Sequence, residues 1–533
     1  MPTAVCHQQS CRLPICLFTG LLLVSLVAAA TLAAWQPPAE STPFETPVRP
    51  RSPVRGLANP RQLLDLFGID ESHLRFLIDG EAVLPEDVDV VSKILMRFHD
   101  LGHENIQRWL SSPVPWDEMM DQVEQHRIGF FLVEGVAQRV ERQEIVSEAA
   151  ELYGFDHFFW VTMRGPGDQP VRVATRTIPS SWPIDSPLSE PVAARAMYLK
   201  HGPQQDGTTD FYLFAAGRIE WYPRARSESL AVSEGLVGLS QMGMDVSLFD
   251  DVRQRNRRSL GAQERDCFYR LLELLGQQTR TAVKIKPRPI NLTMLLRSPQ
   301  AHHGDFLKVQ GTVRRITKIE IPDKAIQARF GIRHYYQLDM FMPLGDQTIQ
   351  IKLNPDDEHG LKFTNQFPLA VCVHQLPAQL ATAQRQFEQG TYAGAMLNET
   401  VDITGFFYKI WGYQSSFTKT DETPRRQLSP MILAFTPEMV ETSRQRVGVL
   451  EIVLAIVFAA GFLITWLLVW RSGRRNEQVL RQRRKNEQVT TAEQFREMAG
   501  GQEEIEMFSD EDEEILDRIW KKVNDSDDSP EPT

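Results

Sequence analysis

The sequence predicts an α+β protein made of two tandem duplicated units, each a helical lead-in followed by a small β-barrel, between two transmembrane helices. Three observations predict this fold class. One order of residue types occurs twice, an alternating apolar pattern follows each helical segment, and an uncharged apolar run lies near each end of the chain. At 533 residues the chain is long enough for several domains with buried cores.

The repeat is clearest between residues 126–163 and 302–342. In each copy an apolar run reaches a glycine, Gly135 or Gly311, and an aromatic segment later follows a histidine, His157 or His334. The two glycine-to-histidine spacings differ by a single residue. This agreement indicates two related domains in tandem.

The repeat extends beyond that stretch. Residues 67–70, Phe-Gly-Ile-Asp, are echoed by residues 242–245, Met-Gly-Met-Asp, and an apolar helical stripe follows each copy. We therefore place the first unit at residues 58–225 and the second at residues 230–437.

The N-terminal segment predicts a membrane span. Residues 13–35 are apolar and uncharged and long enough to cross a bilayer. The small residues at 28–30 leave a cleaved signal peptide as an alternative. Because the apolar run continues to Trp35, the sequence favours a transmembrane signal anchor, with residues 1–12 in the cytoplasm.

Residues 36–57 are rich in proline, which has no backbone N–H to donate to a helix or a sheet. We therefore expect this segment to be an extended linker.

Within each unit the pattern changes from helix to strand. Residues 61–110 show apolar positions at helical spacing, and long alternating strands are predicted at 130–140 and 306–319. A short helix and a second strand follow in each unit, and matching Gly-Asp-Gln turns at 167–169 and 345–347 lead into a third strand.

The strand segments 305–313 (Asp-Phe-Leu-Lys-Val-Gln-Gly-Thr-Val) and 401–407 (Val-Asp-Ile-Thr-Gly-Phe-Phe) resemble strands of OB-fold barrels. The resemblance implies an OB-like barrel in each unit, and it covers more of the second unit than of the first. The first unit lacks the helix that the second shows at 379–389. The whole layout is similar to that of uncharacterised bacterial two-span membrane proteins, which implies an architecture and no activity.

A second membrane span is predicted at residues 452–470, which carry no charge. Seven cations and one acid follow between positions 471 and 485, and such an excess of positive charge marks the cytoplasmic side. The sequence thus predicts a two-pass protein of the cell (inner) membrane, with residues 36–446 extracytoplasmic, as in a periplasmic domain, and the C-terminus cytoplasmic.

The cytoplasmic tail has two parts: a basic juxtamembrane segment, residues 471–502, and an acidic tail, residues 503–533. In the acidic tail Leu516, Ile519, Trp520 and Val523 fall on one face of a predicted short helix. Two interpretations stay open: a helix that binds a cytoplasmic protein, and a solvated acidic tail with an accidental apolar stripe.

Net charge, cysteine content and the lack of known motifs narrow the range of possible functions. The net charge of −11 and the outward-facing location argue against nucleic acid as a partner. Cys267 and Cys372 lie in the folded region, where two separate buried thiols are favoured over a disulfide. No catalytic, phosphate-binding or zinc-binding motif occurs, so we assign no catalytic residue, metal or cofactor.

Histidines are the first candidates for metal ligands or catalytic residues. His99 and His103 have the i, i+4 spacing of zinc ligands, but a third ligand is not evident. His157 and His334 precede matching strands, where a structural hydrogen bond is favoured over catalysis.

Aromatic side chains are the second candidates. Phe158, Trp160 and Tyr335 fall on the predicted outer strand face, and Trp411 with Tyr413 forms a second candidate binding surface. For the rings of the outer strand face, packing between the units or against the lead-in helices is the favoured alternative.

The sequence therefore favours a non-enzymatic, membrane-anchored binding or scaffolding protein that contacts an envelope protein or polymer outside and a cytoplasmic protein through its tail. An envelope hydrolase with dispersed catalytic residues and a ligand sensor are the alternatives.

Overall fold

The computed structural model describes residues 59–203, 210–351, 361–388, 397–420, 423–440 and 456–471. Both predicted units lie in one compact unit that ends at Glu441. The predicted first span, the proline-rich linker, residues 452–455 and the segment 472–533, including the predicted tail helix, lie outside the described residues. Below, the first repeat is residues 59–225 and the second repeat is residues 230–440.

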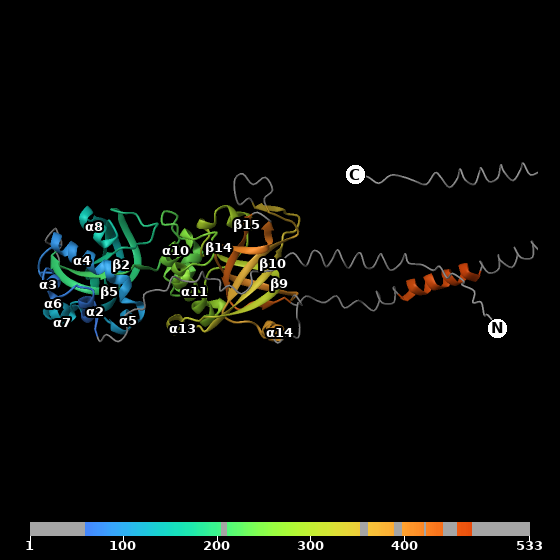
Figure 1. Ribbon diagram of the computed structural model, residues 1–533, viewed down its shortest axis with the longest axis horizontal. Helices are drawn as coiled ribbons and strands as arrows, with labels where there is room; N and C mark the ends of the chain where they lie inside the picture. Colours follow the sequence, from blue (N-terminus) through green and yellow to red (C-terminus); the bar gives the residue numbers. More distant parts are fainter. Residues whose placement is uncertain are drawn as a thin grey trace, which may run out of the picture. The chain divides into compact units, whose positions relative to one another are not determined.

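The first repeat begins with helices and continues with strands (Figure 1). Its elements are α2 (Pro60–Leu66), α3 (Glu71–Leu74), α4 (Pro85–Arg97), η2 (Phe98–Leu101), α5 (His103–Trp109), β1 (Leu110–Ser111), α6 (Trp116–Asp121), α7 (Val123–His126), β2 (Phe130–Glu144), α8 (Ser147–Tyr153), β3 (His157–Arg164), η3 (Pro166–Asp168), β4 (Pro170–Thr175), β5 (Pro187–Pro203), β6 (Asp210–Ala216) and β7 (Glu220–Trp221).

The second repeat follows the same plan with insertions. Its elements are α9 (Glu234–Gln241), η4 (Val246–Leu248), α10 (Phe249–Gln254), η5 (Ala262–Glu264), α11 (Arg265–Gln277), η6 (Arg280–Ala282), β8 (Arg288–Pro289), α12 (Leu292–Arg297), η7 (Pro299–Ala301), β9 (Phe306–Glu320), α13 (Lys324–Phe330), β10 (His334–Pro343), β11 (Ile349–Ile351), β12 (Leu361–Phe363), β13 (Gln366–Val373), α14 (Ala378–Glu388), β14 (Glu399–Thr420), β15 (Thr423–Ala434) and β16 (Glu438–Met439).

The two repeats contain similar mixed sheets, which confirms the predicted α+β duplication. The first sheet has the order β1-β2-β3-β4-β6-β5-β7 and the second β16-β14-β15-β13-β10-β9-β8. Additional pairings, β2 with β5 and β9 with β14, bring five strands of each sheet round into a partly closed ring. In each ring one pair is parallel, β4 with β6 and β13 with β15.

The repeat glycines sit at equivalent places in the two rings. Gly135 of β2 pairs with Val192, and Gly311 of β9 pairs with Val401. A Cβ at Gly135 would collide with the carbonyl oxygen of Arg164, and a Cβ at Gly311 would lie 2.7 Å from that of Phe341. Neighbouring backbone thus occupies the space of a side chain, which is why both strands carry glycine here.

One predicted correspondence differs. The turn at 345–347 leads into β11, which pairs only with β12 in a separate two-stranded sheet. The third ring strand of the second repeat is β13, after this inserted hairpin. The predicted helix at 379–389 is present as α14.

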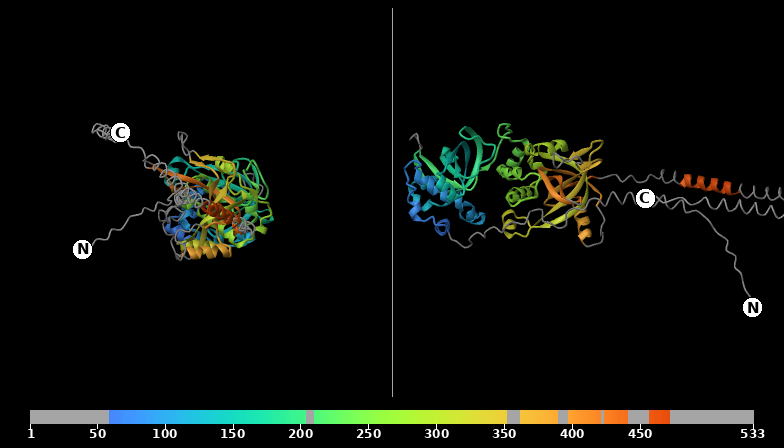
Figure 2. Two further views of the ribbon diagram at one scale, coloured as in Figure 1. Left: turned by 90° about the vertical axis from the view of Figure 1, so that its right-hand side faces the viewer. Right: turned by 45° about the horizontal axis from the view of Figure 1, so that its top comes forward.

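Each ring is covered by the long helix of its own lead-in. Helix α4 packs on β4 and β6, and α11 packs on the equivalent strands β13 and β15. Figure 2 shows the green helices of the second lead-in between the teal strands of the first repeat and the yellow and orange strands of the second. The sheets are therefore buried on both faces, in agreement with the packing against the lead-in helices that the sequence favoured for the aromatic side chains of the outer strand face.

A buried ion pair attaches each helix to its ring. Lys200 of β5 donates to Asp87 of α4 (Nζ–Oδ2 2.7 Å), and Lys409 of β14 donates to Glu264 before α11 (Nζ–Oε1 2.6 Å). All four side chains are fully buried. A register shift precedes each lysine, between Tyr198 and Lys200 in the first copy. Such a bulge turns two successive side chains toward the same helix.

The carboxylates of these pairs have a second role. Asp87 accepts a hydrogen bond from the backbone N–H of Leu84 (2.7 Å), and Glu264 accepts one from that of Gly261 (2.8 Å). Each acid therefore satisfies a free donor at a helix start while it neutralises the lysine. The two repeats therefore share this arrangement of a lysine, a carboxylate and a backbone N–H at the start of a helix.

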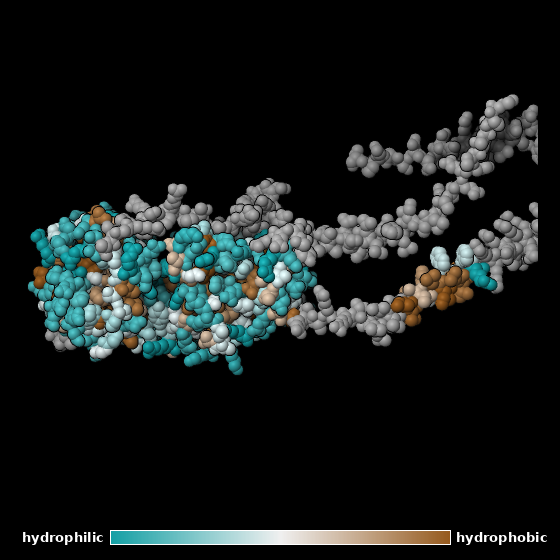
Figure 3. All heavy atoms as spheres, turned by 90° about the horizontal axis from the view of Figure 1, so that it is seen from below, coloured by the Kyte–Doolittle hydropathy of each residue, from teal (hydrophilic) through white to brown (hydrophobic). Residues whose placement is uncertain are grey.

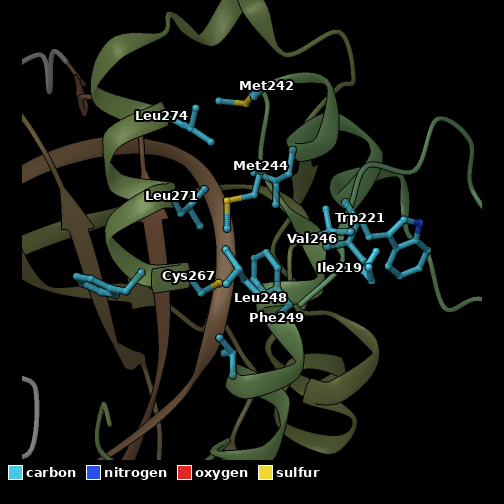
Figure 4. Packing of buried hydrophobic residues seen from close by; sticks show 14 of the residues in the cluster. Ile219, Trp221, Met242, Met244, Val246, Leu248, Phe249, Cys267, Leu271 and Leu274 are labelled. Carbon is cyan, nitrogen blue, oxygen red and sulfur yellow. The ribbon is translucent and has the colours of Figure 1, made fainter. Parts of the chain in front are cut away.

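The main hydrophobic core crosses the junction of the repeats. Figure 4 shows Ile219 and Trp221 of the first repeat beside Val246, and Met244 facing Leu271 of α11. The backbone N–H of Trp221 also donates to Asp245 (2.9 Å). Shared core and shared hydrogen bonds hold the two repeats together.

Cys267 and Cys372 are both free and buried, so the prediction of separate thiols is confirmed. Burial raises the pKa of each thiol, which keeps both protonated.

Residues 456–471 form a helix whose apolar side chains, including Phe458, Phe462 and Trp466, are exposed (Figure 3). Within the described ranges, no helix combines the length and the apolar character needed to cross a membrane.

Candidate ligand-binding cleft

A cleft of about 1100 Å³ lies where the first repeat meets the second. Its first wall comes from α4, α5, the end of β4, β5 and the β6–β7 connection, and its second wall comes from η4 and the turn before it, α11 and α13. Leu95, Phe98, Ile106, Leu248 and Phe330 provide apolar surface. The charged side chains are those of Arg108, Arg176, Arg195, Arg218, Arg270, Arg329, Glu104, Glu220, Asp245, Asp266 and Glu273, with His99 and His103 beside them.

Glu220 organises the first wall. Its side chain is only 11 % exposed, and its carboxylate forms an ion pair with Arg195 and accepts a hydrogen bond from the hydroxyl of Tyr222 (2.8 Å). Burial, followed by the charge of Asp245, raises the pKa of Tyr222 to about 12. The phenol therefore stays protonated and donates at neutral pH.

Asp245 connects the two walls. It accepts from the backbone N–H of Ser247 at the start of η4 (3.0 Å) and from that of Trp221 in β7. Arg218 lies 3.5 Å from the other carboxylate oxygen. The repeated Gly-x-Asp turn recognised in the sequence thus places a capping aspartate at the junction, beside the cleft.

The second wall is organised by α11. Asp266 holds Arg329 of α13 through two hydrogen bonds (2.9 and 2.8 Å), and Glu273 holds Arg270 (2.8 Å). Arg270 also donates to the carbonyl of Gly243 (3.1 Å). A guanidinium held at two points has a fixed orientation, so these arginines present a defined surface to the cleft.

His103 lies among the charges of both walls. Burial lowers its pKa to about 4, and the positive charges of Arg329 and Arg195 add to the effect while Asp266 opposes it. The imidazole is therefore neutral at physiological pH. His99 also borders the cleft, but in the described part of the chain no three His, Cys, Asp or Glu side chains are grouped to hold a metal.

The five aromatic residues predicted as a binding surface are all buried. Phe158 and Trp160 pack in the core beneath α4, and Tyr335 packs edge-to-face on Phe268 of α11. Trp411 and Tyr413 stack on each other with centroids 4.6 Å apart and are 6 % and 8 % exposed. The positions of Phe158, Trp160 and Tyr335 agree with the packing alternative that was favoured for the outer strand face.

The two repeat histidines lie apart from the cleft. His157 lies 2.6 Å from Asp156 (Nδ1–Oδ1), and the ring of His334 contacts that of Tyr336 edge-on. The predicted partner-binding face, Leu516, Ile519, Trp520 and Val523, lies outside the described residues.

Sequence reasoning missed the arginines and carboxylates of the cleft. They come from seven separate segments, and each occupies an ordinary polar position of its helix, strand or connecting turn. Two signals pointed to the region: the spacing of His99 and His103, and the repeated turn that contains Asp245.

Comparisons with known proteins show no family. No family model matches the chain, and no curated protein matches it. Among solved structures, the enzymatic component C2-I of the C2-toxin from Clostridium botulinum is 11% identical over 71% of this chain and 90% of its own, with a TM-score of 0.09. A TM-score this low carries no argument about fold or activity.

Proposed function

We propose that the chain is a membrane-anchored binding protein whose duplicated extracytoplasmic region holds a ligand in the cleft between its repeats. The observation that carries the proposal is the joint construction of this cleft. Its charged side chains come from both repeats, and each wall is fixed by ion pairs of its own. Clefts at such junctions are common ligand sites because two surfaces can contact one molecule.

Two further features support the architecture within this proposal. Each partly closed ring has the first-second-third-fifth-fourth strand order of a five-stranded Greek-key barrel, which supports an OB-type barrel in each repeat. The exposed apolar side chains of helix 456–471, followed by the basic segment, support a membrane anchor with a cytoplasmic tail.

The test of the cleft uses a steric block. Ala328 lines the cleft on α13, and Ala328→Trp would fill part of it. Leu152→Trp is the matched control, because Leu152 is an exposed position on the equivalent helix α8 and does not border the cleft. Full-length protein is purified in mild detergent from its own membranes, and bound molecules are identified by native mass spectrometry.

We expect the wild type and Leu152→Trp to carry the same bound molecule and Ala328→Trp to lose it. A wild-type protein that carries nothing, or a molecule retained equally by Ala328→Trp, would refute a binding role for the cleft.

The tail is tested separately by a chain that ends at Lys485. If the tail binds a cytoplasmic protein, that partner is lost from the truncated chain while the cleft ligand is retained. An unchanged set of partners would remove the tail from the proposal.

An envelope hydrolase is the second candidate. The observation that favours it is that a neutral His103 lies in a charged cleft that also contains Glu104 and Asp266. Hydrolysis of envelope polymer fragments that is abolished by His103→Asn would establish it. Binding is favoured because Glu220, Asp245, Asp266 and Glu273 are each paired with an arginine.

A further inference from the structure

The arginines of the cleft that pair with carboxylates have further N–H donors that these pairs do not use. A guanidinium has five N–H donors, and the two bonds of Arg329 to Asp266 use two of them. Arg195 donates through one terminal nitrogen to Glu220, and its buried Nε has no hydrogen-bond partner among the described residues. Both side chains are therefore held in place by a carboxylate while further donors stay available.

Arg176, which directly follows β4, adds a charge that no carboxylate of the described residues compensates. It has no carboxylate partner in the described ranges, and its guanidinium lies 4.2 Å from the ring centroid of Phe155, which holds it by a cation–π contact. The cleft as a whole contains six arginines and five carboxylates, whereas the chain has a net charge of −11. The cleft therefore has more positive than negative side chains, whereas the chain as a whole is negatively charged.

The arginines of the two walls also act on one another. Burial lowers the pKa of Arg195, and the nearby charges of Arg329 and Arg270 add to this effect, while Tyr222 and Asp245 oppose it. Arg195 belongs to the first repeat, whereas Arg270 and Arg329 belong to the second. A negative group between the walls would relieve this repulsion and would meet donors from both sides.

We propose that the cleft binds a ligand that carries at least two oxyanions, phosphate or carboxylate, clamped between Arg195 of the first repeat and Arg329 of the second. The inference rests on the proposed binding function and names the chemical class of its ligand. Planar guanidinium groups match both kinds of oxyanion with paired hydrogen bonds. A volume of about 1100 Å³ greatly exceeds one ion, so the ligand is a larger molecule or a segment of a polymer.

The experiment is calorimetric titration of the full-length protein in detergent with pyrophosphate and, separately, with citrate. The two probes distinguish phosphate from carboxylate. Arg329→Gln is the main variant because Arg329 and its partner Asp266 are both partly exposed, so the fold should tolerate the change. Arg226→Gln is the charge-matched control, since Arg226 pairs with exposed Glu228 and does not border the cleft.

We expect at least one probe to bind in a 1:1 ratio, at least tenfold more weakly to Arg329→Gln and within twofold of the wild type to Arg226→Gln. Arg195→Gln, checked for folding by its melting temperature, should weaken binding similarly. Equal weakening by the control would indicate nonspecific charge attraction and overturn the inference, as would the absence of binding by both probes. If neither probe binds but Ala328→Trp still loses a co-purified molecule, the binding function stands and the oxyanion assignment fails.

Discussion

At the scale of single residues, the duplicated lysine–carboxylate pair is a fully buried polar feature of the interior. Lys200 and Asp87 are each 0 % exposed, as are Lys409 and Glu264. A buried pair contributes little relative to a well-packed apolar pair, but the removal of one partner leaves an uncompensated buried charge.

We predict that Lys200→Met lowers the free energy of unfolding by about 3–5 kcal/mol. The double variant Lys200→Met, Asp87→Asn should recover much of that loss, because it removes the stranded charge and keeps an acceptor for the N–H of Leu84. Chemical denaturation measures both. A double variant no more stable than the single one would show that the charge is not the source of the cost.

His303 predicts a pH dependence of stability. Its side chain is 1 % exposed and packs on the ring of Phe407, and Nδ1 lies 3.3 Å from the carbonyl oxygen of Gln300. Burial lowers its pKa to about 3, and the charges of Arg253 and Lys409 act in the same direction, against the hydrogen bond to Gln300.

Because the folded-state pKa of His303 lies below its ordinary value of 6.5, the unfolded chain binds more protons between these values. The contribution to stability is complete above pH 6.5 and is lost as the pH falls toward 3. We predict that the stability of the wild type relative to His303→Phe declines by about 3 kcal/mol from pH 7 to pH 4. If the free energies of unfolding of the wild type and His303→Phe changed in parallel with pH, His303 would not be the source of this pH dependence.

At the scale of elements, the ring glycines test how tightly the strands approach. A methyl group at Gly135 would meet the backbone of Arg164, whereas one at Gly154, the left-handed residue that ends α8, would meet only open space. The first substitution therefore separates two paired strands, and the second strains only the local backbone.

We predict that Gly135→Ala costs about 3 kcal/mol, the upper range for overpacking. Gly154→Ala should cost about 1–2 kcal/mol, the penalty of a left-handed conformation with a Cβ. Thermal or chemical unfolding compares them, and Gly311→Ala should behave like Gly135→Ala. Equal costs at Gly135 and Gly154 would contradict a steric clash with the backbone of Arg164 as the main cost at Gly135.

At the scale of the whole molecule, the shared core predicts that the two repeats unfold together. Trp221 of the first repeat is 3 % exposed and belongs to the same core as Phe249 and Leu271 of the second. Trp221→Ala should cost about 3–5 kcal/mol and raise hydrogen exchange in β3 and α11 alike. Ile78→Ala, at a 45 % exposed position, is the control and should change neither. Unchanged exchange in α11 would show that the repeats are independent.

Much of this fold follows from the sequence alone because its signals are local. Apolar spacing predicted the lead-in helices, alternation predicted β2 and β9, and the matching glycines Gly135 and Gly311 marked equivalent positions of the two copies. The order of residue types also identified the duplication. Each of these patterns reflects the periodicity of one element, which a single segment of sequence contains.

Only the tertiary structure shows the features that form where side chains from several separate segments of the chain come together. It decided between a binding surface and packing for Phe158, Trp160 and Tyr335, because each lead-in helix covers the sheet face that carries these rings. It paired Lys200 with Asp87 across 113 positions of the chain, through a bulge that no local pattern reveals. It also gathered the arginines of the cleft from separate elements, since an electrostatic site depends on distances in space and leaves no periodicity in the sequence.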